Sequence, residues 1–288
     1  MPFLWATTLL WAFSFSLIGV YLAGQVDSYF SVVTRIGLAL LVFTPFLLRY
    51  KTSAKLALQM MLIGAIQLGL MYLFYYHSFL LLSVPEILVF TIFTPVYITL
   101  LNDALSKKFH ARYLLGAVLA IFGAAIIRWD NLSNDFWLGF LIVQASNLCF
   151  ASGQVLYKHR LANWPTTTIP PQFYFFGWFY LGAFAVALPA WLILGKPVYP
   201  TTAIQWGALL WLGVFASGLG YFMWNYGATK VNTGQLATMN NVLIPAGLLV
   251  NLVIWNHSTD LLRLLLGSGV ILMALWLVEG KFLKLGKP

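Results

Sequence analysis

Long apolar runs, separated by short breaks with charged or turn-forming residues, follow one another along this chain. A helix needs about 20 apolar residues to cross the hydrocarbon core of a bilayer. Each run is close to that length, so we expect ten transmembrane helices. The expected spans are 3–23, 29–48, 57–80, 86–102, 111–127, 136–158, 173–194, 204–228, 233–255 and 261–279. The chain is therefore predicted to be an all-α integral membrane protein embedded in the lipid bilayer.

Composition argues against a water-soluble fold. Hydrophobic residues make up 61% of the 288 residues and charged residues only 8%, against roughly 25% in soluble domains. The net charge of +9 could suggest nucleic acid, but the basic residues lie in short clusters between apolar runs. We therefore expect no nucleic-acid partner. The one cysteine, Cys149, excludes an intramolecular disulfide and a multi-cysteine metal site.

The basic residues also set the expected orientation, because cytoplasmic loops are enriched in Lys and Arg. The breaks after the second, fourth, sixth and eighth runs, with the C-terminal tail, hold Arg49, Lys51, Lys55, Lys107, Lys108, Arg112, Lys158, Arg160, Lys230, Lys281, Lys284 and Lys287. The opposite side holds only Arg128, Lys196 and Arg263. We therefore expect both termini to face the cytoplasm, in a multi-pass protein of the bacterial cytoplasmic (inner) membrane.

An internal repeat appears when the two halves are set beside each other at an offset of 150 residues. Pro95 then matches Pro245, and the order of the apolar runs agrees. We expect residues 1–132 and 133–288 to be two five-helix repeats within one membrane domain. Five is an odd number, so the second repeat is inverted relative to the first. Inverted repeats are frequent in secondary transporters, where the substrate lies near the midplane and access alternates as one half rocks against the other.

Three segments carry a likeness to a known family: 11–15 (WAFSF), 34–41 (TRIGLALL), and the run from 83–86 (SVPE) to 94–97 (TPVY) followed by 116–123. They resemble the EamA-type branch of the drug/metabolite transporter superfamily, most of all its carboxylate/amino acid/amine transporter group. One departure is 101–103 (LND), which stands where the family often has Leu-Gly-Glu. The resemblance implies ten helices and the movement of small metabolites such as amino acids, often outward.

Two ionisable side chains are candidates for proton coupling, because such groups are costly inside a bilayer. Glu86 begins the fourth expected helix, and a stripe at helical spacing continues from it through Phe90, Phe93 and Tyr97. Its carboxylate can bind a substrate ammonium group or carry a proton; the alternative is an acid that stabilises a helix N-terminus. His77, near the end of the third run, can switch its charge or can belong to an interfacial aromatic belt.

The expected substrate-binding residues combine aromatic walls with amides and one acid. They are Trp11, Ser14, Tyr76, Glu86, Asn147, Gln154, Tyr221, Trp224, Asn225, Asn240 and Asn241. Aromatic faces can hold an ammonium group, and amides supply both donors and acceptors to a zwitterion. The alternative is ordinary packing and helix–helix bonds worth about 1 kcal/mol each. Arg35 can grip a carboxylate, but we expect it to extend to the outer surface.

These patterns favour a secondary active transporter, an exporter by the family likeness, that moves amino acids or amines by alternating access with proton coupling. A facilitating uniporter for other metabolites is the alternative. An intramembrane enzyme is disfavoured, because 216–218 (ASG) is similar to a protease serine motif but Phe215 replaces its glycine and His257 falls on the far side. We expect a small-molecule metabolite as partner, no cofactor and no metal; a homodimer is left open.

Overall fold

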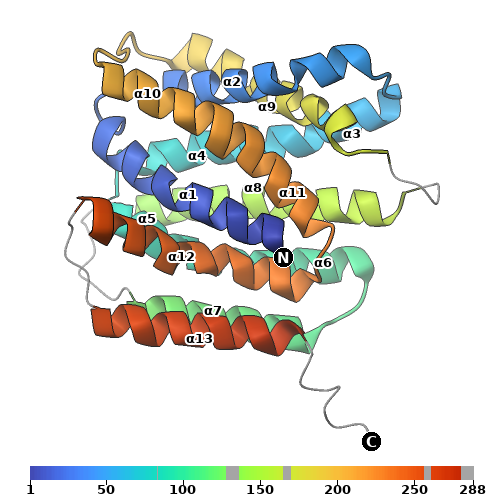
Figure 1. The fold of residues 1–288 in the computed structure, drawn as a ribbon, viewed down its shortest axis with the longest axis vertical. Helices are drawn as coiled ribbons and strands as arrows, with labels where there is room; N and C mark the ends of the chain where they lie inside the picture. Colours follow the sequence, from blue (N-terminus) through green and yellow to red (C-terminus); the bar gives the residue numbers. More distant parts are fainter. Residues whose placement is uncertain (83, 128–135, 165–169, 256–260, 280–288) are drawn as a thin grey trace, which may run out of the picture.

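The computed structural model describes residues 1–82, 84–127, 136–164, 170–255 and 261–279, and the regular secondary structure within these ranges is all helical (Figure 1). Every helical segment begins and ends within four residues of its expected span. The elements are α1 (Pro2–Tyr21), α2 (Ser28–Arg49), α3 (Ala54–Gly64), η1 (Ala65–Leu70), α4 (Met71–Ser78), α5 (Val84–Phe90), η2 (Thr91–Phe93), α6 (Thr94–Ser106), α7 (Ala111–Ile127), α8 (Phe136–Ala162), α9 (Phe173–Leu194), α10 (Ala203–Trp211), η3 (Leu212–Leu219), α11 (Gly220–Ala228), α12 (Thr233–Trp255) and α13 (Leu261–Glu279).

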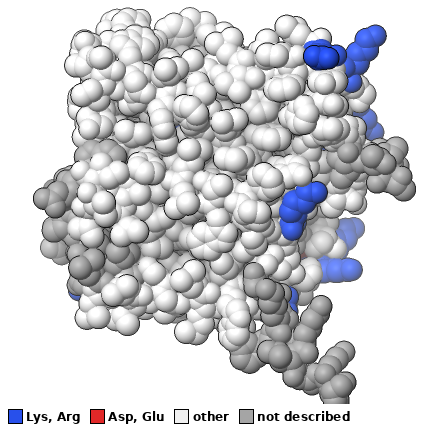
Figure 2. All heavy atoms as spheres, in the orientation of Figure 1, with Lys and Arg blue, Asp and Glu red and all other residues white. Residues whose placement is uncertain are grey.

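Among the described residues, eight helical segments are long and apolar enough to cross a membrane. Two shorter apolar stretches, Ala111–Gly123 in α7 and Leu265–Leu277 in α13, lie side by side at one margin of the bundle (Figure 1). Most Lys and Arg side chains on the face shown in Figure 2 gather at one end of the helices. The tail lysines and Arg128 lie outside the described residues. The count of ten spans and the cytoplasmic position of both termini stay predictions.

Three of the helical rods change their winding partway along. Segments η1 and η3 are π-helical turns, set between α3 and α4 and between α10 and α11. The 3-10 segment η2 precedes Pro95, whose ring excludes an α-helical carbonyl at Thr91. This break corrects the expected stripe from Glu86 to Tyr97, because regular helical spacing does not continue through η2.

Helix α3 packs against α9 through two glycines. A Cβ atom at Gly64 would lie 1.8 Å from the backbone oxygen of Phe179, and one at Gly182 would lie 1.9 Å from that of Met61. No side chain fits at either position, so the two backbones approach as closely as small residues allow. Packing of this kind drives helix association in lipid, where apolar contact alone gives little preference for a protein neighbour.

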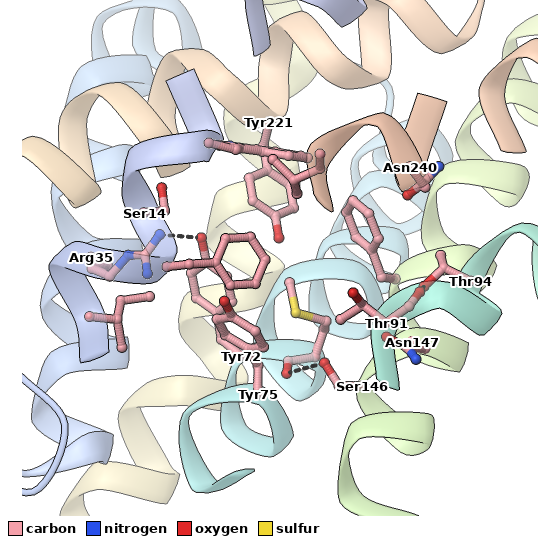
Figure 3. A pocket seen from close by; sticks show the side chains of 16 residues that line it. Ser14, Arg35, Tyr72, Tyr75, Thr91, Thr94, Ser146, Asn147, Tyr221 and Asn240 are labelled. Atoms are coloured by element: carbon pink, nitrogen blue, oxygen red, sulfur yellow. Dashed lines mark hydrogen bonds between the residues drawn. The ribbon is translucent and has the colours of Figure 1, made fainter. Parts of the chain in front are cut away.

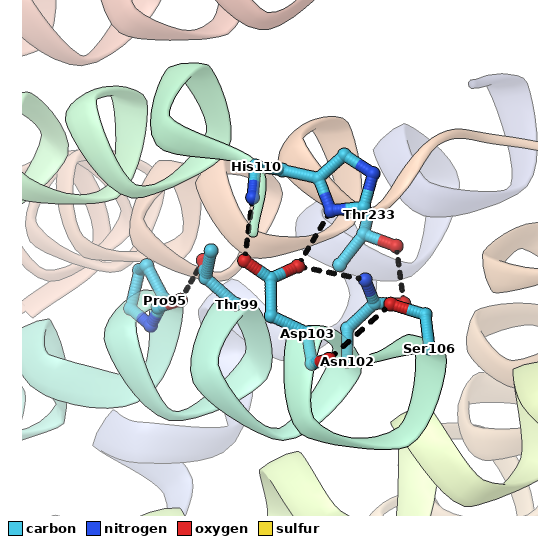
Figure 4. A network of polar contacts seen from close by, with 7 residues as sticks. All are labelled: Pro95, Thr99, Asn102, Asp103, Ser106, His110 and Thr233. Atoms are coloured by element: carbon cyan, nitrogen blue, oxygen red, sulfur yellow. Dashed lines mark hydrogen bonds and ion pairs between the residues drawn. The ribbon is translucent and has the colours of Figure 1, made fainter. Parts of the chain in front are cut away.

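A polar network fixes the turn between α6 and α7 (Figure 4). The carboxylate of Asp103 accepts a hydrogen bond from the His110 backbone N–H (2.8 Å), and His110 Nδ1 lies 2.7 Å from its other oxygen. Asn102 donates a hydrogen bond to the same carboxylate and accepts one from the Thr233 hydroxyl at 2.9 Å. The network therefore ties the end of α6 to the first turn of α12, across the two halves of the chain.

Candidate functional site

A cavity of about 100 Å³ lies in the middle of the bundle, where elements from both halves of the chain converge (Figure 3). It is lined by Trp11, Ser14, Phe15, Ile18, Arg35, Met71, Tyr72, Tyr75, Thr91, Thr94, Ser146, Asn147, Phe150, Tyr221, Asn240 and Leu243. We call it the central pocket. Its lining includes one permanent cation and no acidic side chain. Within the described ranges no group of three or more His, Cys, Asp or Glu could hold a metal ion.

Arg35 of α2 supplies that cation, and its side chain is only 2% exposed. Its guanidinium donates from Nε to the Ser217 hydroxyl at 3.1 Å, from Nη1 to Tyr76 at 2.9 Å and from Nη2 to Tyr72 at 2.6 Å. The same group lies over the Tyr72 ring, 4.4 Å from its centroid. These contacts fix the direction of the guanidinium and hold it at the wall of the pocket.

The partners of Arg35 are neutral hydroxyls, and among the described residues no carboxylate lies within ion-pair distance of it. A guanidinium has five N–H donors, of which these bonds use three. One hydrogen on each terminal nitrogen therefore remains. A cation buried at membrane depth without a counterion is unfavourable, and such residues mark substrate or ion pathways. The two remaining N–H groups can therefore donate to two oxygens of an anion.

The π-helical turns bring the partners of Arg35 to it. Tyr72 comes two residues after η1, and Ser217 lies within η3. A π turn contains an extra residue, so its backbone carbonyls leave the regular ladder and need other donors. Trp11 Nε1 donates to the Ala216 carbonyl at 2.8 Å, and the Tyr180 hydroxyl donates to that of Ser217 at 2.9 Å. The first of these bonds also fixes the orientation of the Trp11 ring at the side of the pocket.

Aromatic rings form the side of the pocket next to Trp11. Its ring centroid lies 5.0 Å from Tyr221, 5.0 Å from Trp224 and 5.8 Å from Phe150. Tyr72 meets Tyr221 edge-to-face at 5.8 Å. The rings present broad apolar surfaces, and their contacts with one another restrict their rotation. They can therefore hold the hydrocarbon part of a ligand between the polar ends of the pocket.

Five of the expected substrate-binding residues line the central pocket: Trp11, Ser14, Asn147, Tyr221 and Asn240. The Ser14 hydroxyl is buried with no hydrogen-bond partner among the described residues.

Three more expected residues lie directly behind the wall. Tyr76 holds Arg35, while Trp224 Nε1 donates to Gln154 Oε1 at 3.0 Å. They position the lining without forming it.

The last three expected substrate-binding residues, Asn225, Asn241 and Glu86, do not line the pocket. Asn225 donates to the Tyr221 carbonyl at 3.0 Å and Asn241 to the Ile92 carbonyl at 3.1 Å, so both side-chain amides bind backbone carbonyls.

Glu86 lies half-buried in the first turn of α5, and His77 is exposed in the last turn of α4. Neither lines the central pocket. Their part in proton coupling stays a prediction, and His257 of the enzyme alternative lies outside the described residues.

The expectation that Arg35 reaches the outer surface is wrong. It sits seven positions after Ser28, about 10 Å along the axis at 1.5 Å per residue, which is too deep for its side chain to reach water at the helix end. That depth was the signal in the sequence. Sequence reasoning also missed Tyr72, Tyr75 and Ser217, because the extra residue of each π turn shifts the face on which these side chains lie.

Comparison with known proteins gives a consistent result. The EamA-like transporter family matches residues 1–129 and 137–280. A protein of Salmonella typhimurium named biotin transporter is 51% identical over 278 residues, covering 96% of this chain and 92% of its own. Its namesake from Escherichia coli K12 is 52% identical over the same shares. A probable biotin transporter of Pseudomonas aeruginosa is 50% identical, covering 96% of each chain.

One solved crystal structure superposes with a TM-score of 0.76 over 96% of this chain and 95% of its own. The two sequences are 16% identical, so this likeness shows the fold alone. The apolar helices and the bacterial relatives together make the chain a multi-pass protein of the inner membrane. The chain belongs to the EamA-like transporter family.

Proposed function

We propose that this protein is a secondary transporter of biotin, and that Arg35 binds the carboxylate of the substrate in the central pocket. The observation that carries the proposal is the buried guanidinium, which has two hydrogens left for a ligand and no carboxylate beside it in the part of the chain that the structure describes. A bound carboxylate would neutralise this charge through charge-assisted hydrogen bonds, which are shorter and stronger than neutral ones. An organic anion is therefore the class of ligand that the pocket favours.

The relatives narrow the choice within that class. Proteins 50–52% identical to this chain over nearly its whole length are named biotin transporters or a probable one. Biotin carries a carboxylate at the end of a hydrocarbon chain, which leads to a neutral bicyclic ring containing a cyclic urea. The pocket offers a cation at one end, aromatic rings beside it, and neutral amides and hydroxyls beyond them. Each part of biotin therefore has a matching surface.

An amine substrate, expected from the sequence, gains no support from the pocket. Its lining contains Arg35 and no acidic residue, so a ligand carrying only an ammonium group would meet a like charge and no counterion. An amino acid would leave its ammonium group without a charged partner. We therefore replace amino acids and amines by biotin as the proposed substrate.

The cavity of about 100 Å³ is smaller than a usual ligand pocket, which measures roughly 300–1,000 Å³. The proposed mechanism is alternating access, in which the pocket widens to admit biotin and then opens to the other side. Two inverted five-helix repeats, 1–132 and 133–288, provide the moving halves. The helix contacts support this division, because they occur in matched pairs: α1 with α12 and α8 with α6, α2 with η3 and α9 with η1, α1 with α11 and α8 with α4.

The test is uptake of labelled biotin by the purified protein in liposomes, with and without a pH gradient. We expect saturable uptake that unlabelled biotin inhibits. Biotinamide, which lacks the negative charge, should compete about a hundredfold or more less well, because hydrogen bonds to charged groups contribute about 1.5–3 kcal/mol each. Equal competition by biotinamide, or uptake of amines without uptake of biotin, would refute the proposal. The gradient arm separates a proton-coupled transporter from a facilitator.

A further inference from the structure

The end of the central pocket away from Arg35 has a uniform chemistry (Figure 3). Its polar lining consists of Thr91, Thr94, Ser146, Asn147 and Asn240, which are all neutral. They come from η2, α6, α8 and α12. We call these five residues the amide–hydroxyl wall. Its hydrogen bonds decide which ligand groups it can receive.

The three hydroxyls of the wall donate their hydrogens to the protein itself. Thr91 donates to the Leu88 carbonyl at 2.8 Å, Thr94 to the Thr91 carbonyl at 2.8 Å and Ser146 to the Met71 carbonyl at 3.2 Å. A backbone carbonyl can only accept, so the direction of these bonds is fixed. Each hydroxyl oxygen is therefore left with lone pairs and no hydrogen to offer.

Asn147 also uses its hydrogens within the protein and leaves an acceptor for a ligand. Its Nδ2 donates to the Phe90 carbonyl at 2.8 Å and to Gln144 Oε1 at 3.2 Å, which uses both amide hydrogens. Gln144 Nε2 also donates to the Phe90 carbonyl, at 3.0 Å, so Gln144 must present its oxygen to Asn147. This leaves no freedom to exchange the nitrogen and oxygen of either amide. The Asn147 Oδ1 atom has no hydrogen-bond donor among the described residues.

Asn240 repeats the arrangement from the second half of the chain. Its Nδ2 donates to the Leu236 carbonyl at 2.7 Å and to Gln154 Oε1 at 3.5 Å. Gln154 Oε1 also accepts from Trp224 Nε1 at 3.0 Å, which fixes the orientation of the Gln154 amide. The Asn240 Oδ1 atom likewise has no donor among the described residues. Both asparagines of the wall thus keep an acceptor and no donor for a ligand.

The central pocket is therefore polarised, with donors at Arg35 and acceptors on the amide–hydroxyl wall. We propose that this wall binds the N–H groups of the cyclic urea of biotin, and so selects the ring while Arg35 selects the acid. This inference rests on the proposed function. A urea presents two N–H donors without a positive charge, which suits a wall of neutral oxygens. An ammonium group is also a donor, but no acidic residue of the pocket lining would balance its charge.

The experiment measures inhibition of labelled-biotin uptake in proteoliposomes by three analogues. Biotin methylated on a urea nitrogen has lost a donor, and desthiobiotin lacks only the sulfur. In 2-iminobiotin a guanidine replaces the urea, so the ring keeps its N–H groups but is positively charged at neutral pH. We expect methylation to weaken inhibition about tenfold or more, the effect of a lost hydrogen bond together with the added bulk. Desthiobiotin should inhibit within about threefold of biotin, whereas 2-iminobiotin should inhibit less well, because no acidic residue of the pocket lining would balance its charge.

Two variants distinguish hydrogen bonding to the N–H groups from a steric effect of the added methyl group. Thr91→Val removes a hydroxyl of the wall, and Asn240→Leu removes an amide. Each should reduce the wild-type preference for biotin over the methylated analogue by about threefold or more. The matched control is Thr44→Val, which removes the same kind of hydroxyl–carbonyl bond (to Leu40, 2.9 Å) from α2 away from the pocket, and it should leave the preference unchanged.

The outcomes are distinct. Biotin uptake that the methylated analogue inhibits as well as biotin does would refute the wall assignment and leave the proposed function standing. An unchanged preference in both Thr91→Val and Asn240→Leu would refute it as well. Stronger inhibition by an analogue with an ammonium group in place of the urea would reassign the wall to a cation. A complete lack of biotin uptake would refute the proposed function and this inference with it.

Discussion

Replacing Arg35 by Met tests the proposed carboxylate anchor directly. Each terminal nitrogen of the guanidinium has one hydrogen left for a ligand. Two hydrogen bonds to a charged group contribute about 3–6 kcal/mol, so the Kd for biotin should rise by about a hundredfold to ten-thousandfold. Arg35→Lys keeps the charge but has no planar fork, and we expect it to weaken binding less than Met does.

Folding of the Arg35→Met variant is a separate question with its own estimate. The change leaves the Tyr76 hydroxyl without its donor, at about 1–3 kcal/mol for a buried group left unsatisfied, while the Tyr72 and Ser217 hydroxyls still bond to each other at 2.9 Å. It also removes a buried cation that has no counterion within the described ranges, which is favourable. The two effects oppose each other, so we expect the variant to fold with a Tm near that of the wild type.

The assay is thermal unfolding in detergent across a range of biotin concentrations, since a ligand that binds only the folded state raises the Tm according to its Kd. Proteoliposome uptake provides the second readout. Arg160→Met is the matched control, because Arg160 donates to Gln59 at 2.7 Å and lies over Trp164, outside the pocket lining. A folded Arg35→Met protein that binds biotin with the wild-type Kd would show that the reasoning about the unpaired cation is wrong.

Three further predictions concern the scaffold and coupling. Gly182→Ala should lower stability by about 1–3 kcal/mol, because its Cβ would lie 1.9 Å from a backbone oxygen of α3. Gly207→Ala, with nothing within 4 Å, should leave the Tm unchanged or raise it, because alanine favours the helix. Asp103→Ala should cost about 1–3 kcal/mol in thermal unfolding, because it leaves the His110 N–H without its acceptor, and an unchanged Tm would contradict this. Glu86→Gln should reduce the dependence of uptake on a pH gradient; full transport with full pH dependence would end the case for its coupling role.

The helices could be predicted from the sequence because lipid imposes one simple requirement on it. A segment that crosses the bilayer must satisfy its backbone internally and be apolar for most of its length. The breaks at 50–53 and 229–232 carry charge or turn residues, and the helices end there. The interruption before Pro95 was not predicted, because the stripe from Glu86 to Tyr97 was expected to keep regular helical spacing, and the 3-10 segment became visible only in the structure.

Only part of the pocket could be predicted. Trp11, Asn147 and Asn240 were accessible to sequence reasoning, because aromatic and amide side chains within apolar runs stand out. Whether an amide offers its oxygen or its nitrogen depends on contacts with other helices, such as that between Asn147 and the Phe90 carbonyl. The pairing of Arg35 with a hydroxyl 182 positions away depends on tertiary packing and on two π turns, which regular helical spacing cannot represent.

The π turns make the central pocket depend on the length of two segments as well as on their residue types. Deleting one residue from η3 would let it wind as a regular α-helix. Side chains on one side of the deletion would then rotate by about 100° relative to those on the other. Tyr221 and the carbonyl that anchors Trp11 lie on opposite sides of such a deletion at Gly218 or Leu219, so they could no longer face the pocket together. A relative with a one-residue gap there would keep its helices but would lose the aromatic side of the pocket.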